Sequence, residues 1–316
     1  MSGGGMRASR EGRRLTDPVP EWEEQYVRRK VEGVKRPLPA RAFGALETLL
    51  DEWTHPRPLR STAELLGCID LLLDADRLGR RAAVIGCGPQ PERVRDLAVA
   101  GYRVVGVEPV AEGVRLAREY LAGAAEVVQG TAERMALESR SQTVVLLENV
   151  LEHVDSVGQT LLEACRVLQP GGVLFVRTTN RQRCSLTGVT WEFSTRFFNW
   201  FPRLVRESYV FDQLHHRPEL AQFSPRPAVH WFSFADLCAS GREAGFARFY
   251  SPHDLLYLAR RPQRGWRGSV SRWSHRQPWL RALAISQLTG DIFMWKRPEP
   301  GEIRGGAGPD LRRHGA

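Results

Sequence analysis

The sequence predicts an α/β fold, in which a doubly wound, seven-stranded and mostly parallel sheet is preceded by helices and carries an inserted cap. Three observations support this fold class. Short apolar runs alternate with segments of helical spacing between residues 81 and 180. The first run ends in the glycine turn Gly86-Cys87-Gly88, and the second ends twenty positions after Gly88 in an acidic residue, Glu108. This order is typical of a site for a nucleoside cofactor.

The N-terminal part is predicted to contain a tail followed by helices. Residues 1–20 are rich in glycine, arginine and proline and are expected to be disordered. Helical spacing then marks 21–36 and 40–53, and a further helix over 61–73 begins at a good capping residue, Ser61 or Thr62. We assign 21–80 to an N-terminal helical segment.

The core, residues 81–180, is predicted to contain five parallel strands joined by right-handed crossovers. These strands are 82–85, 103–107, 125–128, 143–147 and 172–177. Because ligands bind at the carboxyl ends of such strands, Gly86, Glu108, Gly130 and Glu148 are expected to converge on one rim.

The C-terminal part of the sheet is assigned to 233–298. A helix over 234–245 ends at a glycine, and the strand 246–250 follows it. The strand 291–296 is expected to pair with 246–250 in antiparallel orientation. Residues 299–316 are predicted to form a second disordered tail.

Five motifs resemble those of class I S-adenosylmethionine-dependent methyltransferases of the type 11 or quinone O-methyltransferase kind. They are AAVIGCGP at 82–89, VVGVEP at 104–109, QGTAE at 129–133, VVLLENVLEHV at 144–154 and LQPGGVLFV at 168–176. The resemblance implies a Rossmann-like core and S-adenosyl-L-methionine as the cofactor. It implies cofactor contacts from Gly86, Cys87, Gly88, Glu108, Pro109, Gly130, Thr131, Ala132, Glu133, Glu148 and Asn149.

Four positions depart from common cofactor-binding patterns. Pro91 stands where a dinucleotide fingerprint has its third glycine, which disfavours nicotinamide binding but suits the first position of a helix. Val84 replaces the acidic residue that the family has before the glycine turn, and Gln90 replaces a family glycine. Thr131 stands where an acidic residue often holds the adenine amino group. A catalytically weak, cofactor-binding regulatory subunit is therefore an alternative to an enzyme.

Methyl transfer to a hydroxyl needs an aligned acceptor and a group that removes its proton. His153 is the first candidate base because it follows the fourth strand, and His230 is the second; a structural role in capping or packing the helix is the alternative for His153. Quinone-pathway relatives have Glu-x-x-Glu-His in this stretch. This chain has Asn149-x-x-Glu152-His153, which would put three metal ligands on one helical face. Because one carboxylate is replaced by an amide, we predict no metal site.

The composition limits the compartment and the partners. No apolar stretch approaches the roughly 20 residues of a membrane helix, and the chain start lacks the apolar core of a signal peptide, which predicts a cytoplasmic protein. Five scattered cysteines without a C-x-x-C pair indicate buried thiols. The net charge is +9, yet residues 82–180 carry −3, from nine arginines and twelve acidic residues, so the flanks carry +12.

The flanks keep other partners open. Residues 260–281 interleave seven arginines with three tryptophans, and a solvated helical face is the simpler interpretation. Peripheral membrane contact and nucleic-acid binding stay as alternatives.

An aromatic-rich segment follows the core, and the family resemblance makes 181–232 the acceptor-binding insertion. Its aromatic residues favour a planar or apolar acceptor. We therefore predict methyl transfer to a hydroxyl oxygen of a small or lipid-linked molecule. Methylation of tRNA or protein is the enzymatic alternative, supported by the basic flanks alone.

Overall fold

A computed structural model describes residues 59, 61–73, 78–182, 201, 202, 204, 205, 208, 230–259, 277, 279, 285 and 290–298. Several predictions fall outside these residues. They are the two tails (1–20 and 299–316), the helices 21–36 and 40–53, and most of both the insertion 181–232 and the arginine and tryptophan segment 260–281.

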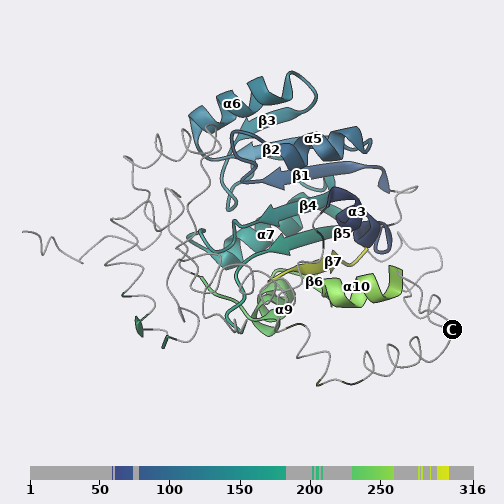
Figure 1. The fold of residues 1–316 in the computed structure, drawn as a ribbon, viewed down its shortest axis with the longest axis vertical. Helices are drawn as coiled ribbons and strands as arrows, with labels where there is room; N and C mark the ends of the chain where they lie inside the picture. Colours follow the sequence, from purple (N-terminus) through teal and green to yellow (C-terminus); the bar gives the residue numbers. More distant parts are fainter. Residues whose placement is uncertain are drawn as a thin grey trace, which may run out of the picture.

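A seven-stranded sheet runs through the described part of the chain in the order β3-β2-β1-β4-β5-β7-β6 (Figure 1). The strands are β1 (Arg81–Ile85), β2 (Arg103–Glu108), β3 (Glu126–Gln129), β4 (Gln142–Glu148), β5 (Leu168–Arg177), β6 (Phe246–Tyr250) and β7 (Ile292–Lys296). Strands β1 to β5 pair in parallel, whereas β7 pairs antiparallel with both β5 and β6. The predicted α/β fold with its antiparallel C-terminal pair is confirmed.

Helices cover both faces of this sheet. The helices α3 (Thr62–Asp70), α5 (Glu92–Val99), α6 (Ala111–Leu121) and α10 (Pro252–Ala259) share one buried cluster with strand residues such as Val84, Leu146 and Phe293. The helices α7 (Val157–Val167) and α9 (Phe234–Glu243) share a second cluster with Ile85 and Leu147. Successive strand residues point to opposite faces, so nearly continuous apolar strands supply both cores.

Three details differ from the sequence prediction. Strand β5 begins at Leu168 rather than at Gly172, and its pairing with β4 is irregular between Gln142 and Val144. Helix α10 was not predicted, because its sequence lies in a long segment without a clear period. Pro91 is the residue before α5 rather than its first helical residue, with φ −79° and ψ 71°.

Serine side chains begin three of the helices. Ser61 forms a capping box with Glu64 at the start of α3, as the sequence predicts, and Ser233 forms one with Asp236 at the start of α9. Ser156 accepts a hydrogen bond from the backbone of Gln159 at the start of α7. Such caps satisfy backbone N–H groups that the first turn leaves without intrahelical partners, and each contributes about 1 kcal/mol.

None of the helices in the described part of the chain combines the length and the apolar character that a membrane span requires.

Candidate functional site

The glycine turn after β1 lies at the carboxyl edge of the sheet. Gly86 and Gly88 have φ values of 65° and 72°, in the left-handed region that favours glycine. The N–H groups of Gly86 and Cys87 donate to the Val107 carbonyl at 2.7 and 3.2 Å, which fixes the turn against β2. A Cβ atom on Gly86 would lie 2.6 Å from Cγ2 of Val150, so a side chain does not fit there.

Glu108 lies at the end of β2, and its side chain faces this turn. The residue is only 2% exposed, and its Oε2 accepts a hydrogen bond from Gly88 N at 2.9 Å. Its Oε1 accepts one from Val110 N at 3.2 Å, and its backbone carbonyl accepts one from Gly130 N at 3.2 Å. The structure thus brings together Gly88, Glu108 and Gly130, which are far apart in sequence.

The loop after β3 approaches the same edge closely. A Cβ atom on Gly130 would lie 3.0 Å from the Arg134 carbonyl oxygen and 3.1 Å from Cγ1 of Val107. Thr131 pairs with Arg134 through two backbone hydrogen bonds. Glu133 accepts a hydrogen bond from Asp155 N at 2.9 Å and so connects this loop to the loop after β4.

The remaining cofactor candidates line the edges of these turns. Ala132 is buried, whereas Pro109 is exposed and its carbonyl accepts a hydrogen bond from Gln129 at 3.2 Å. Cys87 is half-buried, and its burial, reinforced by the Glu108 carboxylate, raises the pKa of its thiol to about 12. This thiol is therefore protonated near neutral pH and is a poor nucleophile.

The loop after β4 is not the helix that the metal hypothesis requires. Asn149 has φ 56° and begins a turn, and α7 starts only at Val157, so Asn149, Glu152 and His153 do not share a helical face. His153 is half-buried in this loop, and its N–H donates to the Val150 carbonyl at 2.9 Å. Within the described residues, no group of three or more His, Cys, Asp or Glu side chains is arranged to hold a metal ion.

Glu152 in the same loop is a buried carboxyl group. It is 3% exposed, and its Oε2 accepts a hydrogen bond from Oγ1 of Thr178 at 2.7 Å. Burial raises its pKa from 4.5 to about 7, and the hydrogen bonds only partly offset this shift. Glu152 was considered only as a metal ligand in the sequence. The segments that bury it are distant in the chain, so no local pattern marks this environment.

The structure places His230 beside the loop that carries His153. The N–H of His230 donates to the Glu152 carbonyl at 3.2 Å, and its own carbonyl accepts a hydrogen bond from Thr179 at 3.0 Å. Its ring Nε2 lies 2.9 Å from the Val154 carbonyl oxygen. A carbonyl can only accept, so Nε2 carries a proton in this contact.

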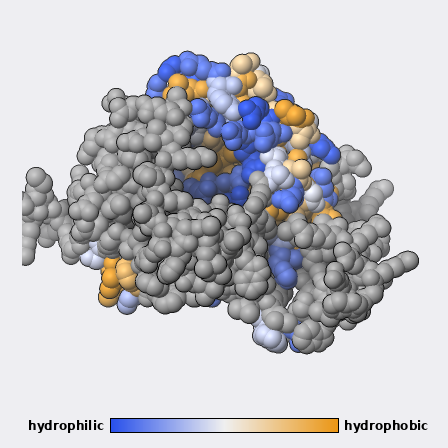
Figure 2. Space-filling view, viewed as in Figure 1, coloured by the Kyte–Doolittle hydropathy of each residue, from blue (hydrophilic) through white to orange (hydrophobic). Residues whose placement is uncertain are grey.

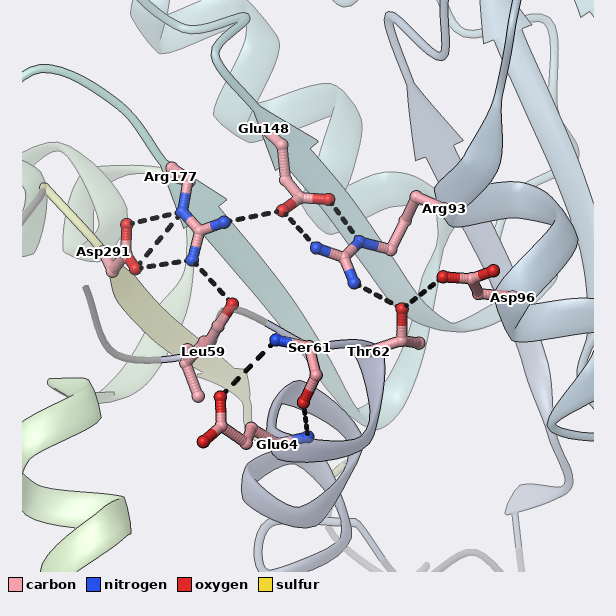
Figure 3. Close-up of polar contacts among 9 residues, drawn as sticks. All are labelled: Leu59, Ser61, Thr62, Glu64, Arg93, Asp96, Glu148, Arg177 and Asp291. Atoms are coloured by element: carbon pink, nitrogen blue, oxygen red, sulfur yellow. Dashed lines mark hydrogen bonds and ion pairs between the residues drawn. The ribbon is translucent and has the colours of Figure 1, made fainter. Parts of the chain in front are cut away.

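Glu148 lies at the end of β4, but its carboxylate is bound by two arginines (Figure 3). Oε2 accepts from Nε of Arg93 at 2.8 Å, and Oε1 accepts from Nη2 of Arg93 at 3.0 Å and from Nη1 of Arg177 at 3.2 Å. The side chains of all three residues are 16–21% exposed. The cofactor contact that the sequence predicts for Glu148 stays a prediction.

The ion pairs of Glu148 extend to other elements. Arg177 also contacts Asp291, which precedes β7, with an N–O distance of 3.0 Å, and donates to the Leu59 carbonyl at 3.3 Å. Arg93 donates to the hydroxyl of Thr62 at 2.6 Å, at the start of α3. We call Arg93, Glu148, Arg177 and Asp291 the arginine network. The two arginines and Asp291 were not predicted as site residues from the sequence. A signal was available for two of them, because Arg177 ends one apolar strand and Asp291 precedes another.

The positions that depart from the family pattern lie in different environments. Val84 is buried in the core beneath α3 and α5, and Gln90 is exposed after the glycine turn. Figure 2, drawn from the same side as Figure 1, shows hydrophilic and hydrophobic residues interspersed on the described part of this face.

Comparison with known proteins gives a family match for part of the chain. Residues 84–176 match the family model described as a methyltransferase domain. The ubiquinone biosynthesis O-methyltransferase of Azorhizobium caulinodans is 35% identical over 134 residues, which cover 40% of this chain and 50% of that protein. This chain therefore matches about half the length of that relative.

Two solved structures illustrate the structural likeness. A putative sarcosine dimethylglycine methyltransferase from Galdieria sulphuraria is 15% identical, with a TM-score of 0.46, and the match covers 88% of this chain and 98% of that one. Phosphoethanolamine N-methyltransferase 2 from Haemonchus contortus, solved with S-adenosyl-L-methionine, is 15% identical with a TM-score of 0.44; the match covers 80% of this chain and 57% of that one. By the match to the family model, residues 84–176 of the chain form a methyltransferase domain.

Proposed function

We propose that this protein is an S-adenosylmethionine-dependent methyltransferase that methylates a hydroxyl oxygen of a small or lipid-linked acceptor. One observation carries the proposal: the buried Glu108 carboxylate faces a glycine turn in which Gly86 has no room for a Cβ atom. A carboxylate in this position accepts hydrogen bonds from the two ribose hydroxyls of a nucleoside. The glycines allow the ligand to approach the backbone.

The residues around the crevice fit this cofactor. Gly86 and Gly88 would lie along the ligand, Glu108 would hold its ribose, and the loop of Gly130 and Thr131 would border its base. When bound, the cofactor supplies a methyl group already activated by a positive sulfur. The protein has to align the acceptor, keep water away and accept a proton.

The acceptor side is assigned to the loop after β4 and to His230. His153 is the proposed base, and His230 is the second candidate because it is anchored to the same loop by Glu152 and Val154. The relative from Azorhizobium caulinodans is named for O-methylation in ubiquinone biosynthesis, which supports a hydroxyl acceptor. We keep the acceptor at this class.

Cofactor binding tests the proposal directly. We expect the full chain to bind S-adenosylhomocysteine in isothermal titration calorimetry, and we expect E108Q to bind about tenfold to a hundredfold more weakly because a charge-assisted hydrogen bond is lost. The matched control is E126Q, at an exposed glutamate at the start of β3, which should change the affinity less than twofold. Absence of binding by the wild-type protein would refute the proposed function.

The base is tested by turnover. With a panel of phenolic acceptors, H153A should lower kcat about a hundredfold while its affinity for S-adenosylhomocysteine stays unchanged. If H230A gives the larger loss, His230 is the base. Tight cofactor binding without turnover of any acceptor would instead support a regulatory subunit.

A further inference from the structure

We propose that Glu148 is a positioning residue for the cofactor site, acting through Arg93 and Arg177 rather than touching the cofactor. The inference rests on the proposed function, because it concerns the same crevice.

The first step is the location of the arginine network. Glu148 and Arg177 end two adjacent parallel strands, and Asp291 precedes the antiparallel strand β7, so all three lie at the carboxyl edge of the sheet. Arg93 lies in the first turn of α5, five residues after Gly88. The network therefore lies at the same edge of the sheet as the glycine turn, and Figure 3 shows its side chains pointing toward one another.

The second step is the contact between two turns. Gly86 packs so closely on Val150 that an added Cβ atom would lie 2.6 Å from its Cγ2. The pair of Arg93 and Glu148 joins the helix after the first turn to the strand before the second one. Glu148 thereby braces the glycine turn against the loop after β4.

The third step concerns Arg177, the second arginine that binds Glu148. Its carbonyl accepts a hydrogen bond from Asn149 N at 2.8 Å, while its guanidinium binds Glu148 and the Leu59 carbonyl. Leu59 has φ 63°, a strained conformation for a residue with a side chain. Arg177 thus holds both the loop after β4 and the chain that leads into α3.

The charges explain why the arrangement of the two arginines depends on Glu148. Arg93 and Arg177 both bind its carboxylate, so their positive charges are held together by one negative charge, while Asp291 contacts Arg177 alone. Removing the charge of Glu148 leaves two guanidinium groups that repel each other at low exposure. We expect the start of α5 and the loop after β4 to move apart as a result.

Calorimetry with S-adenosylhomocysteine tests this role in the full chain. E148Q preserves the size of the side chain and should weaken binding roughly tenfold. R93M should reproduce this loss, and the double variant should bind no more weakly than E148Q alone, because both changes break the same interaction. A direct cofactor contact by Glu148 would leave R93M unaffected, so that result overturns the proposal.

Two controls separate positioning from general destabilisation. E112Q breaks an exposed ion pair with Arg115 on α6 and should leave the affinity unchanged. G241A introduces a clash between α9 and Phe249, where an added Cβ atom would lie 2.5 Å from the ring, and should lower the melting temperature without changing the affinity. If G241A weakens binding as much as E148Q does, the effect of E148Q is structural only and the proposal fails.

The remaining outcomes are also decisive. If E148Q does not fold, R93K is used in its place. Lysine keeps the positive charge but cannot make the bidentate contact with Glu148, so the affinity should be severalfold weaker. If wild type binds and E148Q or R93K binds equally well, the positioning role is wrong while the proposed function stands. If wild type does not bind, the proposed function itself fails.

Discussion

Three glutamates at the carboxyl edge of the sheet illustrate how the surroundings decide the task of a residue. Glu108 faces backbone N–H groups of the glycine turn and of the following residues. Glu148 is bound by two arginines. Glu152 is buried beside the hydroxyl of Thr178, and its pKa is raised to about 7. Only the first environment suits a ribose, and burial allows the carboxyl group of Glu152 to hold a proton near neutral pH.

The raised pKa of Glu152 predicts a dependence of stability on pH. Between its ordinary pKa of 4.5 and about 7, the folded state keeps a proton that the unfolded state has lost. The resulting stabilisation is complete below 4.5 and disappears as the pH rises through 7. E152Q cannot ionise, so its melting temperature relative to wild type should be higher at pH 8 than at pH 5. An equal difference at the two pH values, measured by circular dichroism, would contradict the shifted pKa.

Helices differ in how closely they approach their neighbours, and glycine marks the difference. In α9, a Cβ atom on Gly241 would lie 2.5 Å from Cε1 of Phe249 and 2.8 Å from Sδ of Met294, so the glycine permits close packing on β6 and β7. In α7, a Cβ atom on Gly158 would have no atom within 4 Å. Glycine is therefore required for close packing in α9, whereas in α7 it only lowers the stability of the helix.

Alanine substitutions at these two glycines should have opposite effects. G158A should stabilise the protein by about 0.5–1 kcal/mol, because alanine loses less backbone entropy in a helix. G241A should destabilise it by roughly 1–3 kcal/mol, because overpacking outweighs the gain in helix propensity. Urea unfolding midpoints at unchanged slope measure both effects. Stabilisation by G241A would show that α9 can move away from the sheet.

The whole molecule joins segments that lie far apart in the chain. Arg177 donates to the Leu59 carbonyl across 118 positions and to Asp291 across 114 positions. Strand β7 lies between β5 and β6 and supplies Phe293, whose ring centroid is 4.9 Å from that of Phe175. The C-terminal strand is therefore part of the core, although the matched methyltransferase domain ends at residue 176.

Much of this arrangement could be predicted from the sequence, because it depends on local patterns. Apolar runs predicted all seven strands, and the capping candidates Ser61 and Thr62 predicted the start of α3, where Ser61 is the cap. Helix α10 was not predicted, since its sequence lacks a clear period. For the candidate site, the glycine turn and Glu108 were readable because a tight turn and a strand end leave local marks. The assignments of individual cofactor and catalytic residues stay predictions.

The sequence by itself determined the α/β fold, the order of the cofactor motifs and the positions of Gly86, Glu108, Gly130 and Glu148 at the ends of their strands. Only the tertiary structure decided the partners of each side chain there: arginines for Glu148, a buried hydroxyl for Glu152 and the loop after β4 for His230. The physical reason is the sequence separation over which each kind of interaction acts. Strand periods and turn glycines act over a few residues, whereas burial and ion pairing depend on groups that folding brings together from distant parts of the chain.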